Sequence, residues 1–151
     1  DNLFESVKNI MKNYMLKKNC DAIIIDIHGE AASEKQALAN YLDGKVTAVI
    51  GTHTHVPTSD LRILPHGTAY QTDAGMCGDY DSVIGGDKNK WIENFVEKPG
   101  FQKIKPASVN NTICGTIIKV FEDTGLSSVA KQLILGDILE NKIPDEKLFL
   151  K

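Results

Sequence analysis

Three of the four histidines of the chain lie in two short motifs, each directly after an apolar run. Residues 26–30 read Asp-Ile-His-Gly-Glu and hold His28, whereas residues 51–58 read Gly-Thr-His-Thr-His-Val-Pro-Thr and hold His53 and His55. Neutral imidazole is the commonest metal-binding side chain. Residues i and i+2 of an extended segment project to the same side, so His53 and His55 could serve one site or two adjacent ions. We therefore expect a metal centre at these histidines.

Other side chains near the histidines could complete or support such a centre. Asp26 lies two positions before His28 on the same side, so it could bind a metal, orient the imidazole or cap a strand end. Glu30 could contribute a carboxylate or simply begin the next helix, where acids suit the helix dipole. The further candidates for ligand support or substrate contact are Thr52, Thr54, Asp73, Gly75 and Met76. His66, in a Pro-His-Gly turn, is expected to be an exposed turn residue.

The elements that would position the histidines are predicted from the apolar pattern. Strands over residues 21–27 and 46–50 flank a helix, and the continuous apolar run predicts that the first strand is buried on both faces. The helix begins near Ser33 in a capping-box pattern and stops at Gly44. Strand, helix and strand within about thirty residues form a βαβ unit with parallel strands. Both histidine motifs then emerge at carboxyl ends of strands, where open α/β sheets bind ligands.

The remaining elements follow from periodicity and turn signals. Elements are expected as a helix over 3–17, strands over 61–64 and 68–72, a glycine-rich loop over 73–87, a helix over 88–97, and a hairpin of strands over 112–121 and 126–135. The apolar face of the helix after Ser33 is predicted from Ala37, Leu38, Tyr41 and Leu42. We expect one α/β unit over 1–138, followed by a C-terminal tail over 139–151.

Composition narrows the classes of function. The 151 residues are 42% hydrophobic and 25% charged, which is typical of a globular domain. A net charge of −3 gives no general attraction for nucleic acid or an anionic membrane. No apolar run is long enough to span a bilayer, and three cysteines without CxxC spacing fit a reduced, cytoplasmic location. The sequence lacks P-loop, GxGxxG and GxSxG motifs, which leaves metal-assisted chemistry as the favoured class.

Several motifs taken together resemble the YmdB-type metallophosphoesterases. The resemblance rests on residues 26–30, 51–58 and 72–76, and it extends over about 3–97 and, more loosely, to about 138. The motif at 51–58 is similar to the Gly-His-x-His signature of metallophosphoesterases. The resemblance implies an α/β fold, a four-layer α/β/β/α sandwich of which this chain would be the C-terminal half. It also implies a homo-oligomer.

The same resemblance implies a phosphodiesterase with two metal ions. The ions would be iron or manganese, with zinc or magnesium as alternatives, and His28 and His53 would bind one ion while His55 binds the other. The substrate would be a small cyclic nucleotide such as a 2′,3′-cyclic nucleotide, or another phosphodiester, RNA-derived ones included. A metal-bridging hydroxide would attack the phosphorus. The family's other ligands and its catalytic histidine have no matching motif here, so they are expected in a missing N-terminal half, without which the chain would be inactive.

Two other interpretations stay open from the sequence. The chain could be a regulatory or binding module with a vestigial site, although its three intact histidines argue against decay. It could also be a freestanding hydrolase with one zinc ion held by three histidines.

Two geometric expectations apply to the phosphodiesterase interpretation. The three imidazoles should cluster at one sheet edge, and residues 72–78 should form a wall of the site, with Asp73 nearer to it than Asp79 or Asp81.

Overall fold

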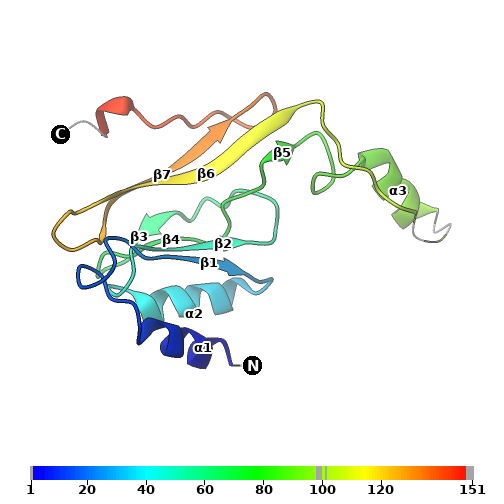
Figure 1. The fold of residues 1–151 in the computed structure, drawn as a ribbon. Helices are drawn as coiled ribbons and strands as arrows, with labels where there is room; N and C mark the ends of the chain where they lie inside the picture. The colour runs from blue at the N-terminus through cyan, green and yellow to red at the C-terminus, as the bar shows by residue number, and fades with distance from the viewer. Residues whose placement is uncertain (1, 98–99, 101, 149–151) are drawn as a thin grey trace.

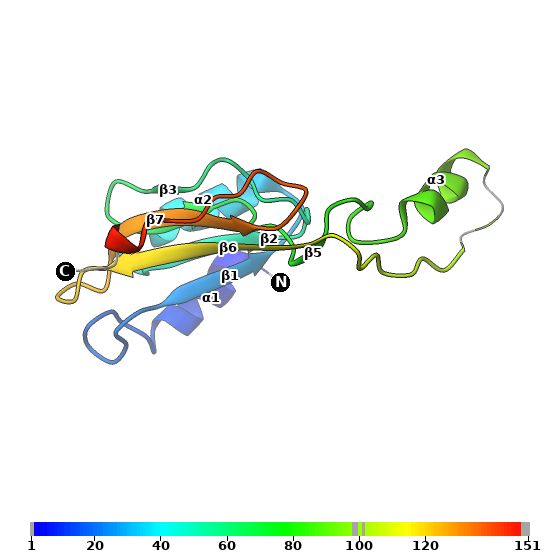
Figure 2. The same cartoon turned by 90° about the horizontal axis from the view of Figure 1, so that it is seen from above.

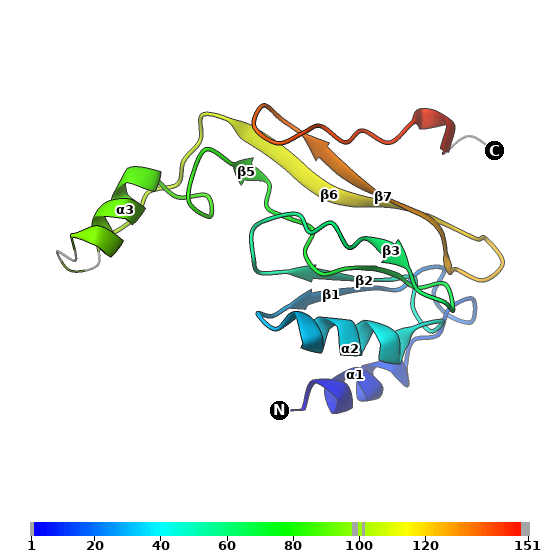
Figure 3. The ribbon, with the colours of Figure 1, turned by 180° about the vertical axis from the view of Figure 1, so that it is seen from behind.

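The computed structural model describes residues 2–97, 100 and 102–148, which form a mixed α/β fold with two sheets (Figure 1). The elements are, in order, α1 (Leu3–Met11), β1 (Ile24–His28), α2 (Ala32–Leu42), β2 (Ala48–Thr52), β3 (Arg62–Ile63), β4 (Ala69–Gln71), β5 (Gly78–Asp79), α3 (Lys88–Val96), β6 (Asn111–Val120), β7 (Ser127–Leu135) and the 3-10 helix η1 (Glu146–Leu148). Helices α1 and α2 cover one face of the first sheet, and the β6-β7 hairpin lies over its other face (Figures 1 and 3). The segment around α3 projects away from these layers (Figure 2).

The predicted βαβ unit is present and organises the first sheet, whose strand order is β1-β2-β4-β3. Strands β1 and β2 are parallel, with His28 opposite Thr52 at the end of the ladder. Strand β4 joins β2 in parallel on its other side, and β3 pairs with β4 in the antiparallel sense. The parallel arrangement is therefore confirmed, and the carboxyl ends of β1, β2 and β4 lie at one edge of the sheet.

The hydrophobic core lies between the two helices and the first sheet. Its buried members come from both helices, from three strands and from the connections beside them: Val7, Ile27, Leu38, Ala39, Leu42, Val46, Val49, Leu64 and Tyr70. Truncating a fully buried leucine in such a core costs about 2–5 kcal/mol. This packing holds α2 against the sheet and so fixes where β1 and β2 end.

The apolar face predicted for α2 is only partly correct. Leu38 and Leu42 are buried as expected, but Ala37 and Tyr41 are exposed. The buried face includes Lys35 instead. The reason is that the Lys35 ammonium donates hydrogen bonds to backbone carbonyls at the strand ends, which holds the helix in this rotation.

The predicted helix boundaries hold at some ends and fail at others. The capping box at Ser33 is wrong, because α2 begins earlier with Ala31 as its N-cap and no side-chain cap hydrogen bond. The predicted stop is confirmed, since Gly44 follows the helix with φ 79°. Helix α1 ends at Met11 rather than near residue 17, and Lys17 has φ 58°, which a right-handed helix cannot contain.

Strand β1 is not buried on both faces, so that prediction is wrong. It is one of the two edge strands of the sheet, and its burial alternates along the strand. Ile25 and Ile27 pack towards the helices, whereas Ile24 is 64% exposed and Asp26 and His28 are exposed as well. A continuous apolar run does not distinguish a central strand from an edge strand, which explains the error.

The second sheet, in the order β5-β6-β7, contains the predicted hairpin. Strands β6 and β7 pair antiparallel, and β5 adds to β6 from within the segment expected to be wholly a loop. Thr116 Oγ1 donates to Gln71 Oε1 at 2.6 Å, which joins the two sheets. The segment expected as a tail returns to β7 through a bridge between Ile134 and Lys142.

Helix α3 confirms the helix predicted over 88–97. Its N-cap is Asp87, whose carboxylate accepts the N–H groups of Asn89 and Lys90. None of the helices in the described ranges is long and apolar enough to cross a membrane.

Candidate functional site

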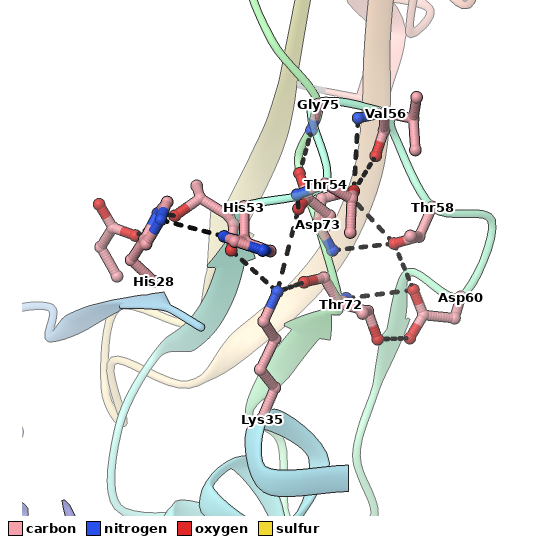
Figure 4. Close-up of polar contacts among 12 residues, drawn as sticks. His28, Lys35, His53, Thr54, Val56, Thr58, Asp60, Thr72, Asp73 and Gly75 are labelled. Carbon is pink, nitrogen blue, oxygen red and sulfur yellow. Dashed lines mark hydrogen bonds and ion pairs between the residues drawn. The ribbon is translucent and has the colours of Figure 1, made fainter. Parts of the chain in front are cut away.

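Two of the three motif histidines meet at the carboxyl edge of the first sheet. His28 is the last residue of β1, and His53 directly follows β2. His28 Nε2 lies 3.3 Å from His53 Nδ1, and the two rings are arranged edge to face with centroids 5.1 Å apart (Figure 4). The structure therefore brings together two ring nitrogens from neighbouring parallel strands.

The ring of His28 is oriented by polar neighbours on the same edge. Its Nδ1 lies 3.1 Å from Thr52 Oγ1, and the Thr52 hydroxyl lies 3.4 Å from Asp26 Oδ1. When Thr52 donates to the carboxylate, its oxygen accepts the Nδ1 proton of His28. This tautomer leaves Nε2 of His28 unprotonated and directed at His53. Asp26 thus acts on His28 through Thr52, which matches the orienting role considered from the sequence.

The nitrogen pair of His28 and His53 fits a shared metal ion. Imidazole nitrogens bind an ion such as zinc at about 2.1 Å, which places neighbouring ligands about 3.4 Å apart. The observed separation of 3.3 Å agrees with that value. Within the described residues, no group of three or more His, Cys, Asp or Glu side chains is close enough to hold a metal ion. The separation suits two ligands of one ion and equally a hydrogen bond between the two rings, so a metal centre at this pair stays a prediction.

His55 lies on the same edge but turns its Nδ1 elsewhere. This nitrogen lies 2.9 Å from the carbonyl oxygen of Ile84, which can only accept a hydrogen bond. Nδ1 of His55 is consequently the protonated nitrogen, and Nε2 is the one available as a ligand. A backbone carbonyl that fixes the tautomer in this way is typical of metal-binding histidines.

The turn that carries His53 and His55 is not extended, so the premise that the two side chains project to the same side is wrong. His53 has φ 138° and His55 has φ 65°, and both values lie where residues other than glycine rarely occur. Such conformations cost on the order of 1–3 kcal/mol each and persist only where the surroundings impose them. The contacts that impose this turn are therefore part of the site.

Asp73 is the nearest of the three candidate aspartates to this turn, as predicted. Its Oδ2 accepts the N–H of Thr54 at 2.6 Å and its Oδ1 accepts that of Gly75 at 2.9 Å (Figure 4). Asp79 instead accepts backbone N–H groups beyond α3, and Asp81 pairs with a lysine of α3. Asp73 thus contacts the backbone between the histidines rather than facing the nitrogen pair.

Lys35, like Tyr80, is a residue of this site that was not among the candidates predicted from the sequence. Its side chain is 1% exposed, and Nζ donates to the carbonyl oxygens of Thr52 at 2.8 Å and Thr72 at 3.1 Å. A signal for it exists in the sequence. Lys35, Leu38, Ala39 and Leu42 have the i, i+3, i+4, i+7 spacing of one helix face, so a lysine in that pattern marks a buried charge.

The glycine-rich segment, including Gly75 and Met76, contacts His55 through Tyr80. The Tyr80 hydroxyl accepts the N–H of Met76 at 3.1 Å and lies 3.1 Å from the carbonyl oxygen of His55. Burial raises the pKa of Tyr80, so this hydroxyl remains a proton donor. A Cβ at Gly75 would lie 2.9 Å from the same hydroxyl, which explains the need for glycine there. Residues 73–76 therefore lie beside the His53–His55 turn, and their role as a wall of a metal site stays a prediction.

The remaining candidates lie away from the nitrogen pair. Glu30 is exposed between β1 and α2. His66 is exposed, as expected, and its ring contacts Asp43 at 2.9 Å at the opposite end of the sheet. Cys114 is buried and its thiol has a raised pKa because of desolvation, which agrees with a core role.

Comparisons with known proteins identify relatives of this chain. Residues 1–133 match the model of the family described as YmdB-like protein. The chain is 42% identical over 120 residues to a 2′,3′-cyclic-nucleotide 2′-phosphodiesterase of Bacillus subtilis (strain 168), which covers 80% of this chain and 45% of the relative. It is 51% identical over 87 residues to a putative phosphatase/phosphodiesterase of Mycoplasma pneumoniae, which covers 57% of this chain and 31% of that relative.

Two solved structures share the fold. A hypothetical protein from Thermus thermophilus superposes with a TM-score of 0.79 at 37% identity, over 91% of this chain and 52% of that one. A novel phosphatase from Mycoplasma pneumoniae gives a TM-score of 0.79 at 32% identity, over 99% of this chain and 50% of that one. The chain spans about half the length, or less, of the proteins that it matches.

Proposed function

This chain belongs to the YmdB-like protein family, and on that premise we propose that it carries part of the centre of a metal-dependent phosphodiesterase. The observation that carries the proposal is the contact of His28 Nε2 with His53 Nδ1 at 3.3 Å, at the sheet edge where α/β proteins bind ligands. The name of the Bacillus subtilis relative supports 2′,3′-cyclic nucleotides as the substrate class. Other phosphodiesters, RNA-derived ones included, are the alternatives.

The proposed ligands divide between two ions. His28 and His53 would hold one ion, and His55, with Nε2 available, would hold the second. Imidazole donors suit iron and zinc, whereas manganese and magnesium favour carboxylate and water oxygens. We propose iron or manganese, with zinc or magnesium as alternatives. When bound, such ions polarise a phosphodiester and lower the pKa of a water molecule.

The other residues of this chain would prepare the histidines for that task. Thr52 and the Ile84 carbonyl fix the protonated nitrogen of His28 and His55, respectively, so that in each ring Nε2 keeps a free lone pair. Asp73 and Tyr80 hold the backbone of the turn through Thr54 and the His55 carbonyl.

Three histidines are too few ligands for a two-ion centre. The chain corresponds to 45% of the Bacillus subtilis relative, so that relative has residues with no counterpart here. We propose that the other ligands and the catalytic acid come from polypeptide outside these 151 residues, within a four-layer α/β/β/α sandwich. The open edge at β1, with Ile24 64% exposed, is consistent with this completion. The cytoplasmic location and the homo-oligomer expected from the sequence belong to the same proposal.

The test joins this chain to the part of the Bacillus subtilis relative that it does not match. We expect the fusion to hydrolyse 2′,3′-cyclic AMP with added Mn²⁺, and the isolated chain to do so at the background rate. His53→Ala in the fusion should lower kcat/KM by at least about 100-fold, because it opens the proposed ligand shell. His66→Ala, which removes an exposed imidazole far from the site, is the matched control and should retain activity. Equal activity of the two variants would contradict the proposal.

A further inference from the structure

The turn between His53 and His55 is held by a carboxylate that solvent does not reach. Asp73 is 1% exposed, and its two oxygens accept the N–H groups of Thr54 and Gly75. The Thr54 amide lies directly between the two strained histidines, and its hydrogen bond, at 2.6 Å, is short. Asp73 therefore fixes the middle of the turn rather than one of its ends.

A buried carboxylate needs a nearby cation, and Lys35 supplies it. Its Nζ lies 3.9 Å from Asp73 Oδ2, and both side chains are 1% exposed. Removing one partner of such a pair would leave an uncompensated buried charge. The two residues come from different elements, Lys35 from α2 and Asp73 from the segment after β4, so the pair joins the helix layer to the site.

The ammonium also joins the ends of two neighbouring strands. The β2-β4 ladder ends at the pair of Ile50 with Gln71, and beyond it Lys35 Nζ contacts the carbonyl oxygens of Thr52 and Thr72 (Figure 4). Thr52 is the residue before His53, and Thr72 is the residue before Asp73. Lys35 thus adds to the backbone hydrogen bond of the Ala74 N–H with the Gly51 carbonyl oxygen, at the point where the site begins.

We propose that Lys35 and Asp73 are positioning residues that hold the His53–His55 turn in the geometry for metal binding. The proposal rests on the metal centre proposed above. Stability alone does not explain the pair, because a buried ion pair replaced by packed apolar groups is often neutral or stabilising. Its hydrogen bonds go instead to the backbone on both sides of His53. Lys35 acts on the centre only through these backbone contacts.

The test compares Lys35→Met with Thr47→Val in the fusion described above. Thr47 is also buried and hydrogen-bonded to backbone groups, but its partners are Ile23 and Gly125, away from the histidine edge. Two quantities are measured, the exchange rate of the Thr54 amide and the affinity for Mn²⁺ by calorimetry. Lys35→Met should speed Thr54 exchange at least about 10-fold and weaken Mn²⁺ binding about 10–100-fold, the range found for residues that orient ligands. Thr47→Val should change neither value by more than about twofold.

The outcomes separate this inference from the proposed function. If the Lys35→Met variant keeps the wild-type Thr54 exchange rate and the wild-type Mn²⁺ affinity, the positioning role is overturned. If the wild-type fusion binds no Mn²⁺, the proposed metal centre fails, and Thr54 exchange and the nuclear Overhauser contact between the His28 and His53 rings alone decide the positioning role. If Lys35→Met does not fold, Asp73→Asn takes its place, because it removes the charge but keeps an acceptor for one N–H. Asp73→Asn with wild-type Thr54 exchange would equally overturn the role.

Discussion

Gly51→Ala should disrupt the histidine edge, because a Cβ added there meets a closer atom than one added at any other glycine that the structure describes. A Cβ at Gly51 would lie 1.9 Å from the carbonyl oxygen of Thr72 and 3.0 Å from Lys35 Cδ. Contacts below 3.0 Å essentially never occur for a Cβ, so β2 and the end of β4 must separate by about 1 Å. Overpacking of this kind costs about 3 kcal/mol, and the separation also lengthens the Lys35 hydrogen bonds to both strands.

Urea unfolding followed by circular dichroism measures this effect. With an m-value of about 2 kcal/mol/M, a loss of about 3 kcal/mol lowers the unfolding midpoint by about 1.5 M. Gly115→Ala is the matched control, because a Cβ there has no atom within 4 Å. That variant should change the free energy of unfolding by less than about 1 kcal/mol. A Gly51→Ala midpoint equal to that of Gly115→Ala would refute the close approach of the two strands and, with it, the geometry of the site.

Two further predictions concern side chains that hold loops. Tyr80→Phe removes the hydroxyl that contacts the His55 carbonyl and the Met76 N–H, so it should lower the free energy of unfolding by about 1–3 kcal/mol. Tyr14→Phe, at an exposed ring, is the control and should be neutral in the same urea assay. The second is a pH dependence: desolvation raises the pKa of Asp43, but the stronger combined effect of hydrogen bonds, chiefly from His66, leaves it below the ordinary 3.8. The ionised Asp43 carboxylate stabilises the fold fully above pH 3.8, and this stabilisation is lost as the pH falls through the lowered pKa of Asp43. Between about pH 5 and pH 2, the urea midpoint should therefore decline less for Asp43→Asn than for the wild type.

The sequence was sufficient for the parallel pairing of β1 with β2, but not for the strand order of the first sheet. Parallel β1 and β2 follow from local information, because the apolar runs, the intervening helix and the Gly44 stop all lie within about thirty residues. The placement of His28 and His53 at one edge follows from that topology alone. The hairpin of β6 and β7 was equally accessible, since its two strands are joined by a short turn.

The internal geometry of the site was not accessible in the same way. The hydrogen bonds of Lys35 run to carbonyl oxygens 17 and 37 residues away, and backbone acceptors leave no trace in side-chain patterns. The positive φ values of His53 and His55 likewise depend on Asp73, Tyr80 and the carbonyl of a distant loop rather than on the residues of the turn. Alternation predicts side-chain direction only where the backbone is extended, so the i, i+2 argument had to fail there.

Strain and buried charge at the histidine edge have a common physical explanation. Two residues with positive φ, other than glycine, cost on the order of 1–3 kcal/mol each, and the buried Lys35–Asp73 pair contributes little net stability. The apolar packing of Leu38 and Leu42 against the sheet offsets these costs. Helix α2 contributes both the apolar packing and the buried ammonium. Its buried face presents leucines to the core and Lys35 to the strand ends. The element that stabilises the fold therefore also imposes the conformation of the His53–His55 turn.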